Sequence, residues 1–342
     1  METDHSALHG FGPATRTWFS EAFDSPTPAQ RQAWEAIRRG DDTLVVAPTG
    51  SGKTLAAFLT AIDRLMHARE TPAAPGTPDT PERPDKPESP GKPDDDEYVR
   101  VLYISPLKAL AADVDRNLRR PLRGISAVSR RDSGMTGMAP REVRVGVRTG
   151  DTAPEERRAL AAHPPDILIT TPESLFLMLT SAARKSLSRV EMVIIDEIHS
   201  LAGTKRGGHL AVSLERLDAA LPRRAQRVGL SATVRPLDEV GRYLTGGRPV
   251  SIVQPPAAKS WDLRVVVPVE DMGALGQVTD DLAGPAAGDP RRSSIWPHVE
   301  EQLVDLVAAH TSTLVFANSR RLAERLTSRI NEIWDERRGH EP

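Results

Sequence analysis

The sequence predicts an α/β protein built on a doubly wound, mostly parallel sheet. Short runs of β-branched and aliphatic residues alternate with longer stretches rich in Ala, Leu and Arg, which is the pattern of a parallel sheet covered by helices on both faces. Polar motifs follow three of the apolar runs directly, at residues 47–54, 196–199 and 231–233. Because the carboxyl ends of parallel strands share one edge of a sheet, we expect these motifs to lie side by side.

Six apolar runs are expected to form the strands of this sheet. They are rich in Val, Ile and Leu, the residues that suit strands buried on both faces. The runs occupy residues 43–46, 101–105, 143–148, 167–170, 192–195 and 228–230. Together they complete one domain, which we place at residues 1–255.

Residues 256–342 are expected to begin a second domain of the same kind. The pattern there predicts a strand at 263–269, a helix at 299–309, a strand at 313–316 and a helix from 320 to about 334. These elements are too few for a complete sheet domain. We therefore expect the second domain to be partial.

Charge and composition limit the class of protein. The net charge of −2 excludes a protein that holds nucleic acid through overall basicity, although it leaves room for a local basic groove. The absence of cysteine excludes disulfides, thiolate zinc sites and iron–sulfur clusters. No apolar run approaches the roughly 20 residues of a membrane helix. We expect a cytoplasmic protein with no membrane contact.

Residues 70–97 interrupt the first domain with a proline-rich insertion. Prolines recur there at every third position, from Pro72 to Pro93, among many acidic and basic residues. This composition is typical of a disordered surface segment. A polyproline II helix has three residues per turn, so a docking strip for a partner is the alternative.

The first polar motif, at residues 47–54, predicts a phosphate-binding loop between a strand and a helix. Its glycines allow backbone N–H groups to surround a β-phosphate at the positive end of the following helix. Lys53 is expected to reach the β- and γ-phosphates, and the Thr54 hydroxyl to bind Mg²⁺. Ala47 replaces the first glycine of the strict consensus. The expected ATP contacts in the loop are Thr49, Gly50, Ser51, Gly52, Lys53 and Thr54.

The second motif begins with Asp196 and Glu197, directly after the apolar run 192–195. At the carboxyl end of a central strand, Asp196 can hold Mg²⁺ through water. Glu197 can orient or deprotonate the water that attacks a γ-phosphate. An acidic pair that merely caps the next helix is the structural alternative, and the phosphate loop on a neighbouring strand disfavours it. We expect Lys53, Asp196 and Glu197 to be the catalytic residues.

In this order, the motifs resemble those of superfamily-two helicases of the DExH type, most closely the bacterial Lhr (large helicase-related) family. Further resemblances are residues 23–30 to the Q motif, 105–110 to motif Ia, 148–151 to motif Ib, 170–175 to motif Ic and 314–320 to motif IV. The match extends over about residues 17–330. It implies RecA-like domains, with Gln30 at the adenine edge of ATP. It also implies that His199, Ser231 and Thr233 couple the nucleotide site to the nucleic-acid site.

The resemblance also implies that motifs Ia, Ib and Ic hold the backbone of a single strand. Lys108 and Arg148 supply charge, and Thr149 and Thr171 supply hydroxyl donors for phosphate oxygens. Taken singly, Lys108 and Arg148 are better explained as solvated surface charges, and each gains its functional interpretation from its motif. No base-reading set is visible, so binding is expected to be nearly independent of sequence and sensitive to salt. The family resemblance favours DNA, although backbone contacts alone fit DNA or RNA.

The resemblance leaves two functional hypotheses. Helicases of this class hydrolyse ATP between two RecA-like domains, and the second domain supplies arginines in motif VI, which this sequence lacks together with motif V. We therefore expect an amino-terminal part of a larger 3′ to 5′ helicase that uses ATP and Mg²⁺. The alternative is a nucleotide- and nucleic-acid-binding module without useful turnover. A P-loop kinase or transporter ATPase is disfavoured, because neither accounts for motifs Ia to Ic or IV.

Overall fold

The computed structural model describes most of the chain as two separate units. The described residues are 6–67, 98–133, 142–232, 234–256, 262–267 and 295–339. The units are Met1–Ala258 and Lys259–Pro342. The proline-rich insertion expected at 70–97 and the predicted coupling residue Thr233 lie outside the described residues.

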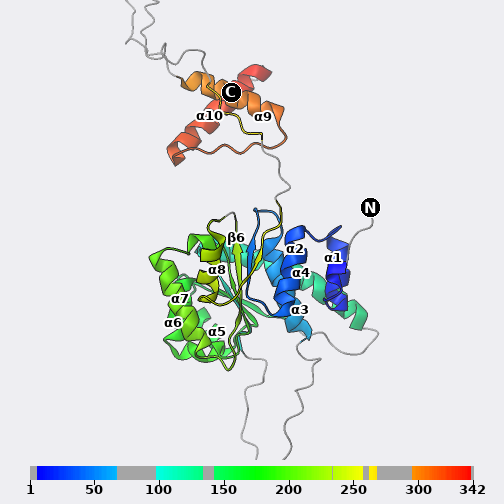
Figure 1. The fold of residues 1–342 in the computed structure, drawn as a ribbon. Helices are drawn as coiled ribbons and strands as arrows, with labels where there is room; N and C mark the ends of the chain where they lie inside the picture. Colours follow the sequence, from blue (N-terminus) through cyan, green and yellow to red (C-terminus); the bar gives the residue numbers. More distant parts are fainter. Residues whose placement is uncertain are drawn as a thin grey trace, which may run out of the picture. The chain divides into compact units, whose positions relative to one another are not determined.

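A parallel sheet forms the centre of the first unit (Figure 1). Within the described residues it has seven strands in the order β3-β4-β2-β5-β6-β1-β7. The strands are β1 (Thr43–Val46), β2 (Val101–Ile104), β3 (Val145–Arg148), β4 (Ile167–Thr170), β5 (Met192–Ile195), β6 (Gln226–Ser231) and β7 (Ser251–Val253). All six predicted strands are present, and the α/β fold class is confirmed. The seventh, β7, pairs with β1 in parallel.

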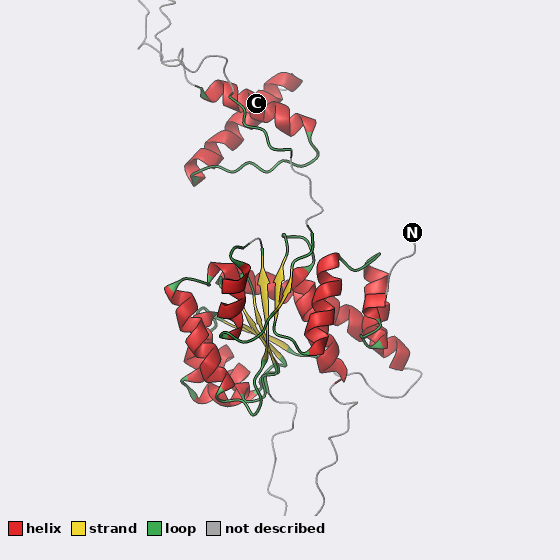
Figure 2. Cartoon of the chain, viewed as in Figure 1, coloured by secondary structure: helices red, strands yellow, loops and turns green. Residues whose placement is uncertain are grey.

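Helices cover both faces of this sheet (Figure 2). Its described helices of eight residues or more are α1 (Pro13–Ala22), α2 (Pro28–Arg39), α3 (Lys53–His67), α4 (Lys108–Ser133), α5 (Pro154–Ala162), α6 (Pro172–Leu179), α7 (Lys205–Asp218) and α8 (Leu237–Thr245). Helices α1 to α4 share one hydrophobic core, and α6 to α8 share the other. Successive residues of β1 alternate between the two cores: Val45 packs with α1 to α4, and Leu44 and Val46 pack with α6 to α8.

The second unit contains α9 (Trp296–Ala309) and α10 (Arg320–Arg338). The strands predicted at 263–269 and 313–316 are wrong where they can be checked, since residues 262–267 and 313–316 form no strand. Parallel strands are stable only when their backbone groups pair with a neighbour, and neither segment has one among the described residues. Val265 and Phe316 are 100% and 87% exposed. That this unit begins a second RecA-like domain stays a prediction.

No helix in the described ranges is sufficiently long and apolar to span a membrane. The cytoplasmic location stays a prediction.

Candidate functional site

The strand order divides the carboxyl edge of the sheet into two halves. The phosphate loop, the acidic pair and Ser231 follow or end β1, β5 and β6, which are consecutive in the sheet. The phosphate loop and the acidic pair were expected on neighbouring strands, but β6 lies between β1 and β5. The segments that follow β2, β4 and β3 occupy the other half of the same edge. The residues predicted to bind ATP and those predicted to bind nucleic acid therefore lie in adjoining regions, which meet between β2 and β5.

The phosphate loop connects β1 to α3 through two glycines in left-handed conformations. Gly50 and Gly52 have φ values of +83° and +80°, which residues with a side chain rarely adopt. A Cβ atom on Gly52 would also lie 2.4 Å from Nε2 of Gln30. The backbone N–H of Ala47 donates to the carbonyl oxygen of Ser231 at 3.1 Å, so the loop begins in contact with the end of β6. Ala47 is therefore compatible with the loop despite the consensus glycine.

Two polar side chains of this loop suit a phosphate ligand. The Oγ atom of Ser51 is buried and has no hydrogen-bond partner among the residues that the structure describes. The Lys53 side chain is 7% exposed; its Nζ atom lies 3.4 Å from the carbonyl oxygen of Ala47 and 4.0 Å from Oε1 of Glu197. A buried ammonium group with such long contacts can donate hydrogen bonds to phosphate oxygens as additional partners. Thr54 follows in the first turn of α3 and is half-buried.

Asp196 is held in place by a residue that the sequence patterns did not single out. Tyr103, in the neighbouring strand β2, donates its hydroxyl hydrogen to Oδ2 of Asp196 at 2.5 Å. Burial, together with the negative charge of Asp196, raises the pKa of Tyr103 well above its ordinary value of 10.0. Oδ1 of Asp196 accepts from the backbone N–H of Glu197 at 2.9 Å. Both carboxylate oxygens are therefore oriented, and their remaining lone pairs suit water molecules of a Mg²⁺ ion.

Glu197, His199 and Ser231 form a connected series across β5 and β6. The Oε2 atom of Glu197 lies 3.4 Å from Nδ1 of His199, and the same Nδ1 lies 3.1 Å from Oγ of Ser231. Glu197 has a φ of +44°, in the left-handed region that a non-glycine residue adopts at a cost. The series connects the expected catalytic carboxylate to the end of β6. Thr233, the third predicted coupling residue, lies outside the described residues.

Gln30 lies beside the phosphate loop and supports it. Its Oε1 accepts from the backbone N–H of Thr27 at 2.9 Å, and its Nε2 donates weakly to the carbonyl oxygen of Gly52 at 3.4 Å. The Thr27 hydroxyl donates to the carbonyl oxygen of Ser51 at 2.8 Å. These residues also form the capping box that begins α2. Contact between Gln30 and adenine stays a prediction.

Lys108 begins α4 and Thr149 directly follows β3, and both belong to the other half of the edge. Lys108 is exposed, and its Nζ forms an ion pair with Oδ1 of Asp151 at 2.6 Å. Its terminal atoms would be 3.2 Å from a Cβ added to Gly150, so its side chain lies over this glycine. The Thr149 hydroxyl accepts from the backbone N–H of Asp151 at 3.2 Å. The lysine therefore already has a carboxylate partner, and its contact with a nucleic-acid phosphate stays a prediction.

Arg148 lies beside a second arginine that the sequence patterns missed. Burial, and then the nearby charge of Arg157, lowers the pKa of Arg148 from its ordinary value. Arg157, in the first turn of α5, donates to the carbonyl oxygens of Gly150 at 2.7 Å and Thr149 at 3.4 Å. Two neighbouring guanidinium groups favour an anion between or beside them. The pairing depends on the fold, because the arginines belong to different elements.

Thr171 is only 2% exposed, and its hydroxyl begins α6 as a helix cap. It accepts from the backbone N–H of Ser174 at 3.4 Å and donates to Oγ of Ser174 at 3.2 Å. The side chain is therefore committed to the helix. A direct contact between Thr171 and a nucleic-acid strand stays a prediction.

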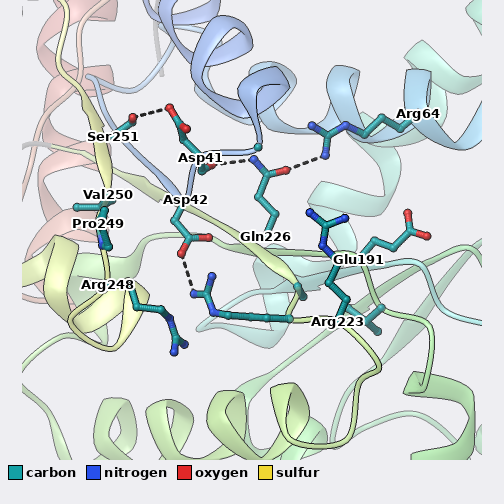
Figure 3. A pocket seen from close by; sticks show the side chains of 14 residues that line it. Asp41, Asp42, Arg64, Glu191, Arg223, Gln226, Arg248, Pro249, Val250 and Ser251 are labelled. Carbon is teal, nitrogen blue, oxygen red and sulfur yellow. Dashed lines mark hydrogen bonds and ion pairs between the residues drawn. The ribbon is translucent and has the colours of Figure 1, made fainter.

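A separate hollow of about 740 Å³ lies at the opposite, amino-terminal edge of the sheet (Figure 3). Asp42 in its wall forms an ion pair with Arg224 at 2.7 Å and accepts from the backbone N–H of Arg227 at 2.7 Å. Gln226 donates to the carbonyl oxygens of Ile37 and Asp41. These contacts fasten the starts of β1 and β6 to each other. Neither the phosphate loop nor the acidic pair lines this hollow, so its volume does not mark the nucleotide site.

A glycine-rich phosphate loop after β1 and an acidic pair after β5, at the same edge of a parallel sheet with β6 between them, define a P-loop nucleoside triphosphatase. A family model described as DEAD/DEAH box helicase matches residues 27–240. This match covers more than half of the chain, which therefore belongs to the DEAD/DEAH box helicase family.

Relatives and solved structures place the chain near the Lhr helicases. It is 56% identical to an Lhr helicase of Mycolicibacterium smegmatis over 98% of its own length and 19% of that protein's. It is 52% identical to the Lhr helicase/uracil glycosylase of Escherichia coli K12, over 97% of this chain and 20% of that protein. The structure of Mycobacterium smegmatis helicase Lhr bound to ssDNA and AMP-PNP matches with a TM-score of 0.72, over 98% of this chain and 37% of that one. The chain thus spans about a fifth of the length of these two curated relatives.

Proposed function

We propose that the chain binds ATP with Mg²⁺ and couples ATP hydrolysis to movement on single-stranded DNA in the 3′ to 5′ direction. The observation that carries the proposal is the connected series Lys53, Glu197, His199 and Ser231, which lies beside the half of the edge that contains Lys108 and Arg148. A similar solved protein, Mycobacterium smegmatis Lhr, is described as bound to ssDNA and AMP-PNP. That description supports both the nucleotide and the strand in this proposal.

In the nucleotide half, each expected residue has one chemical task. Lys53 and Ser51 would bind phosphate oxygens, and Thr54 and Asp196 would hold Mg²⁺. The bound ion would neutralise charge on the phosphates during transfer. Glu197 orients the attacking water and accepts its proton, and its contacts with Lys53 and His199 keep the carboxylate at the site.

In the other half, positive groups and backbone amides hold the phosphates of the strand. Arg148 and Arg157 form the basic pair, and Lys108 exchanges Asp151 for a phosphate group. Such contacts make affinity nearly independent of base sequence and reduce it as salt rises, with a slope of about −0.7 per contacted phosphate. Arg157→Ala should therefore weaken strand binding and flatten its salt dependence, with nucleotide affinity unchanged.

A second candidate function is a nucleotide- and nucleic-acid-binding module without useful turnover. The Glu197 side chain is 30% exposed, so one side of the described site is open. In related phosphoryl transfers an arginine brought to the open side contributes about 10³–10⁵ in rate, and a site without it would turn over slowly. Both functions require ATP binding that is lost in Lys53→Ala. They differ in whether bound ATP is hydrolysed.

The deciding experiment measures ATP hydrolysis by the 342-residue chain with and without single-stranded oligodeoxythymidine. Under the first proposal the strand stimulates hydrolysis, and Glu197→Gln abolishes it while ATP still binds. A rate that is the same with and without DNA, alongside normal ATP binding, would support the binding module. Unwinding of substrates with a 3′ or a 5′ tail by the wild-type chain then tests direction, and an RNA strand of equal length tests the choice of DNA.

A further inference from the structure

We propose that Arg206 is a positioning residue that links the segment carrying the acidic pair to both loops expected to hold the nucleic-acid strand. The role rests on the proposed function, since it concerns communication between the two halves of that site. Arg206 lies outside every motif found in the sequence. Its side chain nevertheless contacts the loop after β2 and the start of α6 at the same time.

The Arg206 guanidinium uses three nitrogen atoms in these contacts. Nη2 donates to Oε2 of Glu173 at 2.9 Å, and Nε donates to Oε1 of the same carboxylate. Nη1 donates to the carbonyl oxygen of Pro106 at 2.5 Å. Glu173 is in the first turn of α6, two residues after Thr171, and Pro106 lies two residues before Lys108. One side chain therefore fastens the loop after β2 to the start of α6, which follows β4.

Hydrogen-bonded turns connect Arg206 to Glu197 through the backbone. Ser200 N–H donates to the carbonyl oxygen of Glu197 at 2.8 Å, and Thr204 N–H donates to that of Leu201 at 3.0 Å. Thr204 then caps α7, and Arg206 lies in the first turn of this helix. Because these hydrogen bonds make the backbone between Glu197 and α7 stiff, a displacement of Glu197 when nucleotide binds is transmitted to α7. Through Arg206 this displacement reaches the two segments expected to bind nucleic acid.

The exposure of this ion pair indicates a geometric role. The side chains of Arg206 and Glu173 are 38% and 54% exposed, and exposed ion pairs contribute little to folding. The hydrogen bond from Arg206 lowers the pKa of Glu173, which keeps the pair ionised at neutral pH. A planar guanidinium can bind both carboxylate oxygens and a carbonyl oxygen together, whereas the single ammonium of lysine cannot. Arg206→Lys should therefore retain the charge and lose the link.

Hydrogen exchange of the wild-type, Arg206→Lys and Arg206→Ala chains provides the test. Exchange is followed in residues 105–109 and 171–176, with and without AMP-PNP and Mg²⁺. In the wild type, nucleotide should slow exchange in both segments by about fivefold or more, the lower range of typical site-to-site coupling. In both variants the response should fall below about twofold, with nucleotide affinity and thermal stability close to wild type. A wild-type response retained in Arg206→Ala would overturn the role, as would no response in the wild type.

Two further variants control for charge and for pairing. Lys205→Ala removes a neighbouring exposed cation that makes no hydrogen bond or ion pair with described residues, and it should keep the full response. Adding Glu173→Ala to Arg206→Ala should reduce the response no further, because both substitutions remove the same contact. An additive loss in the double variant, or a loss in Lys205→Ala, would contradict a specific link through Arg206.

Strand affinity measured in parallel separates this role from the proposed function. If the wild-type loops respond to nucleotide through Arg206 but single-stranded DNA does not bind, the proposed function fails and the link remains. If DNA binds and stimulates hydrolysis, yet the Arg206 variants respond like wild type, only the link fails.

Discussion

At the residue scale, the orientation of the acidic pair depends on one hydroxyl group. Tyr103 is fully buried, stacks on Phe58 with ring centroids 4.8 Å apart, and donates to Asp196. Its raised pKa keeps the phenol protonated, so it remains a donor at neutral pH. The carboxylate expected to hold Mg²⁺ is thus oriented by the neighbouring strand as well as by its own loop.

We expect Tyr103→Phe to weaken Mg²⁺-dependent nucleotide binding by about tenfold, since an unrestrained Asp196 carboxylate is less well placed for the ion. The ring stack remains, so the free energy of unfolding should fall by only about 1 kcal/mol for the lost hydrogen bond. Titration of ATP affinity against Mg²⁺ and urea unfolding measure the two effects. Tyr98→Phe, a change outside the site, is the matched control. An unchanged Mg²⁺ dependence in Tyr103→Phe would show that Asp196 needs no such support.

Sequence reasoning predicted the residues whose roles follow from local spacing and missed those that act across strands. Lys53 and Glu197 stand beside glycines or after apolar runs, so their neighbours along the chain identify them. Tyr103 acts through a residue of another strand, and Arg206 through a loop 100 residues earlier in the sequence. Arg157 contacts a loop only seven residues earlier, but its neighbour Arg148 belongs to a different element. A tyrosine within an otherwise aliphatic strand was the signal available for Tyr103. Nothing local distinguishes Arg206 from other surface arginines.

At the element scale, the contact between Glu173 of α6 and Arg206 of α7 makes the stability of the fold depend on pH, in a direction that can be predicted. The hydrogen bond from Arg206 lowers the pKa of Glu173 below its ordinary value of 4.5. A carboxylate with a lowered folded-state pKa stabilises the fold above its unfolded pKa and loses this contribution as pH falls through the folded value. The contact is thus complete at neutral pH and is lost in acid.

The stability difference between wild type and Arg206→Ala should follow this titration. Near pH 7 we expect less than about 1 kcal/mol, because the pair is exposed and screened by solvent. Below about pH 4 the difference should shrink towards zero as Glu173 becomes protonated. Urea unfolding at a series of pH values measures it. A difference that stays constant from neutral to acid pH would mean that Glu173 does not contribute to it.

The sequence predicted the strands that are buried on both faces. It failed where the presence of a strand depends on pairing with a neighbouring strand. The residues of β4 and β5 are all buried, and their aliphatic runs are distinctive. β7 has only three residues, and its pairing with β1 does not show in its sequence. The apolar residues near Leu263 and Leu314 have the same composition as true strands, but they pair with no described neighbour. Composition indicates that a segment can be a strand, and only a partner makes it one.

At the scale of the whole molecule, the two units differ in the size of their cores. The first unit buries two large hydrophobic clusters against its sheet. In the second, the buried residues of the two described helices are Glu300, Val304, Leu326 and Ile333. A core this small leaves α9 and α10 dependent on a few side chains.

We expect Leu326→Ala to unfold α9 and α10 while the first unit keeps its melting temperature. Removal of a buried leucine side chain costs about 2–5 kcal/mol, which is large for a core of this size. Hydrogen exchange measures the stability of each unit separately. Exchange in α9 and α10 reports on the second unit, and exchange in β5 reports on the first. Arg321→Ala, at an exposed position of the same helix, is the control. Loss of protection in β5 as well would mean that the units fold as one.

The left-handed backbone of Glu197 implies a conflict between the stability of the fold and ATP hydrolysis. A glutamate at a φ of +44° stores strain that asparagine or glycine tolerates more easily. Replacement by either residue can relax the fold while it removes the carboxylate that we propose for hydrolysis. Selection for heat resistance alone would therefore favour inactive molecules at this position, and only selection for turnover retains glutamate there.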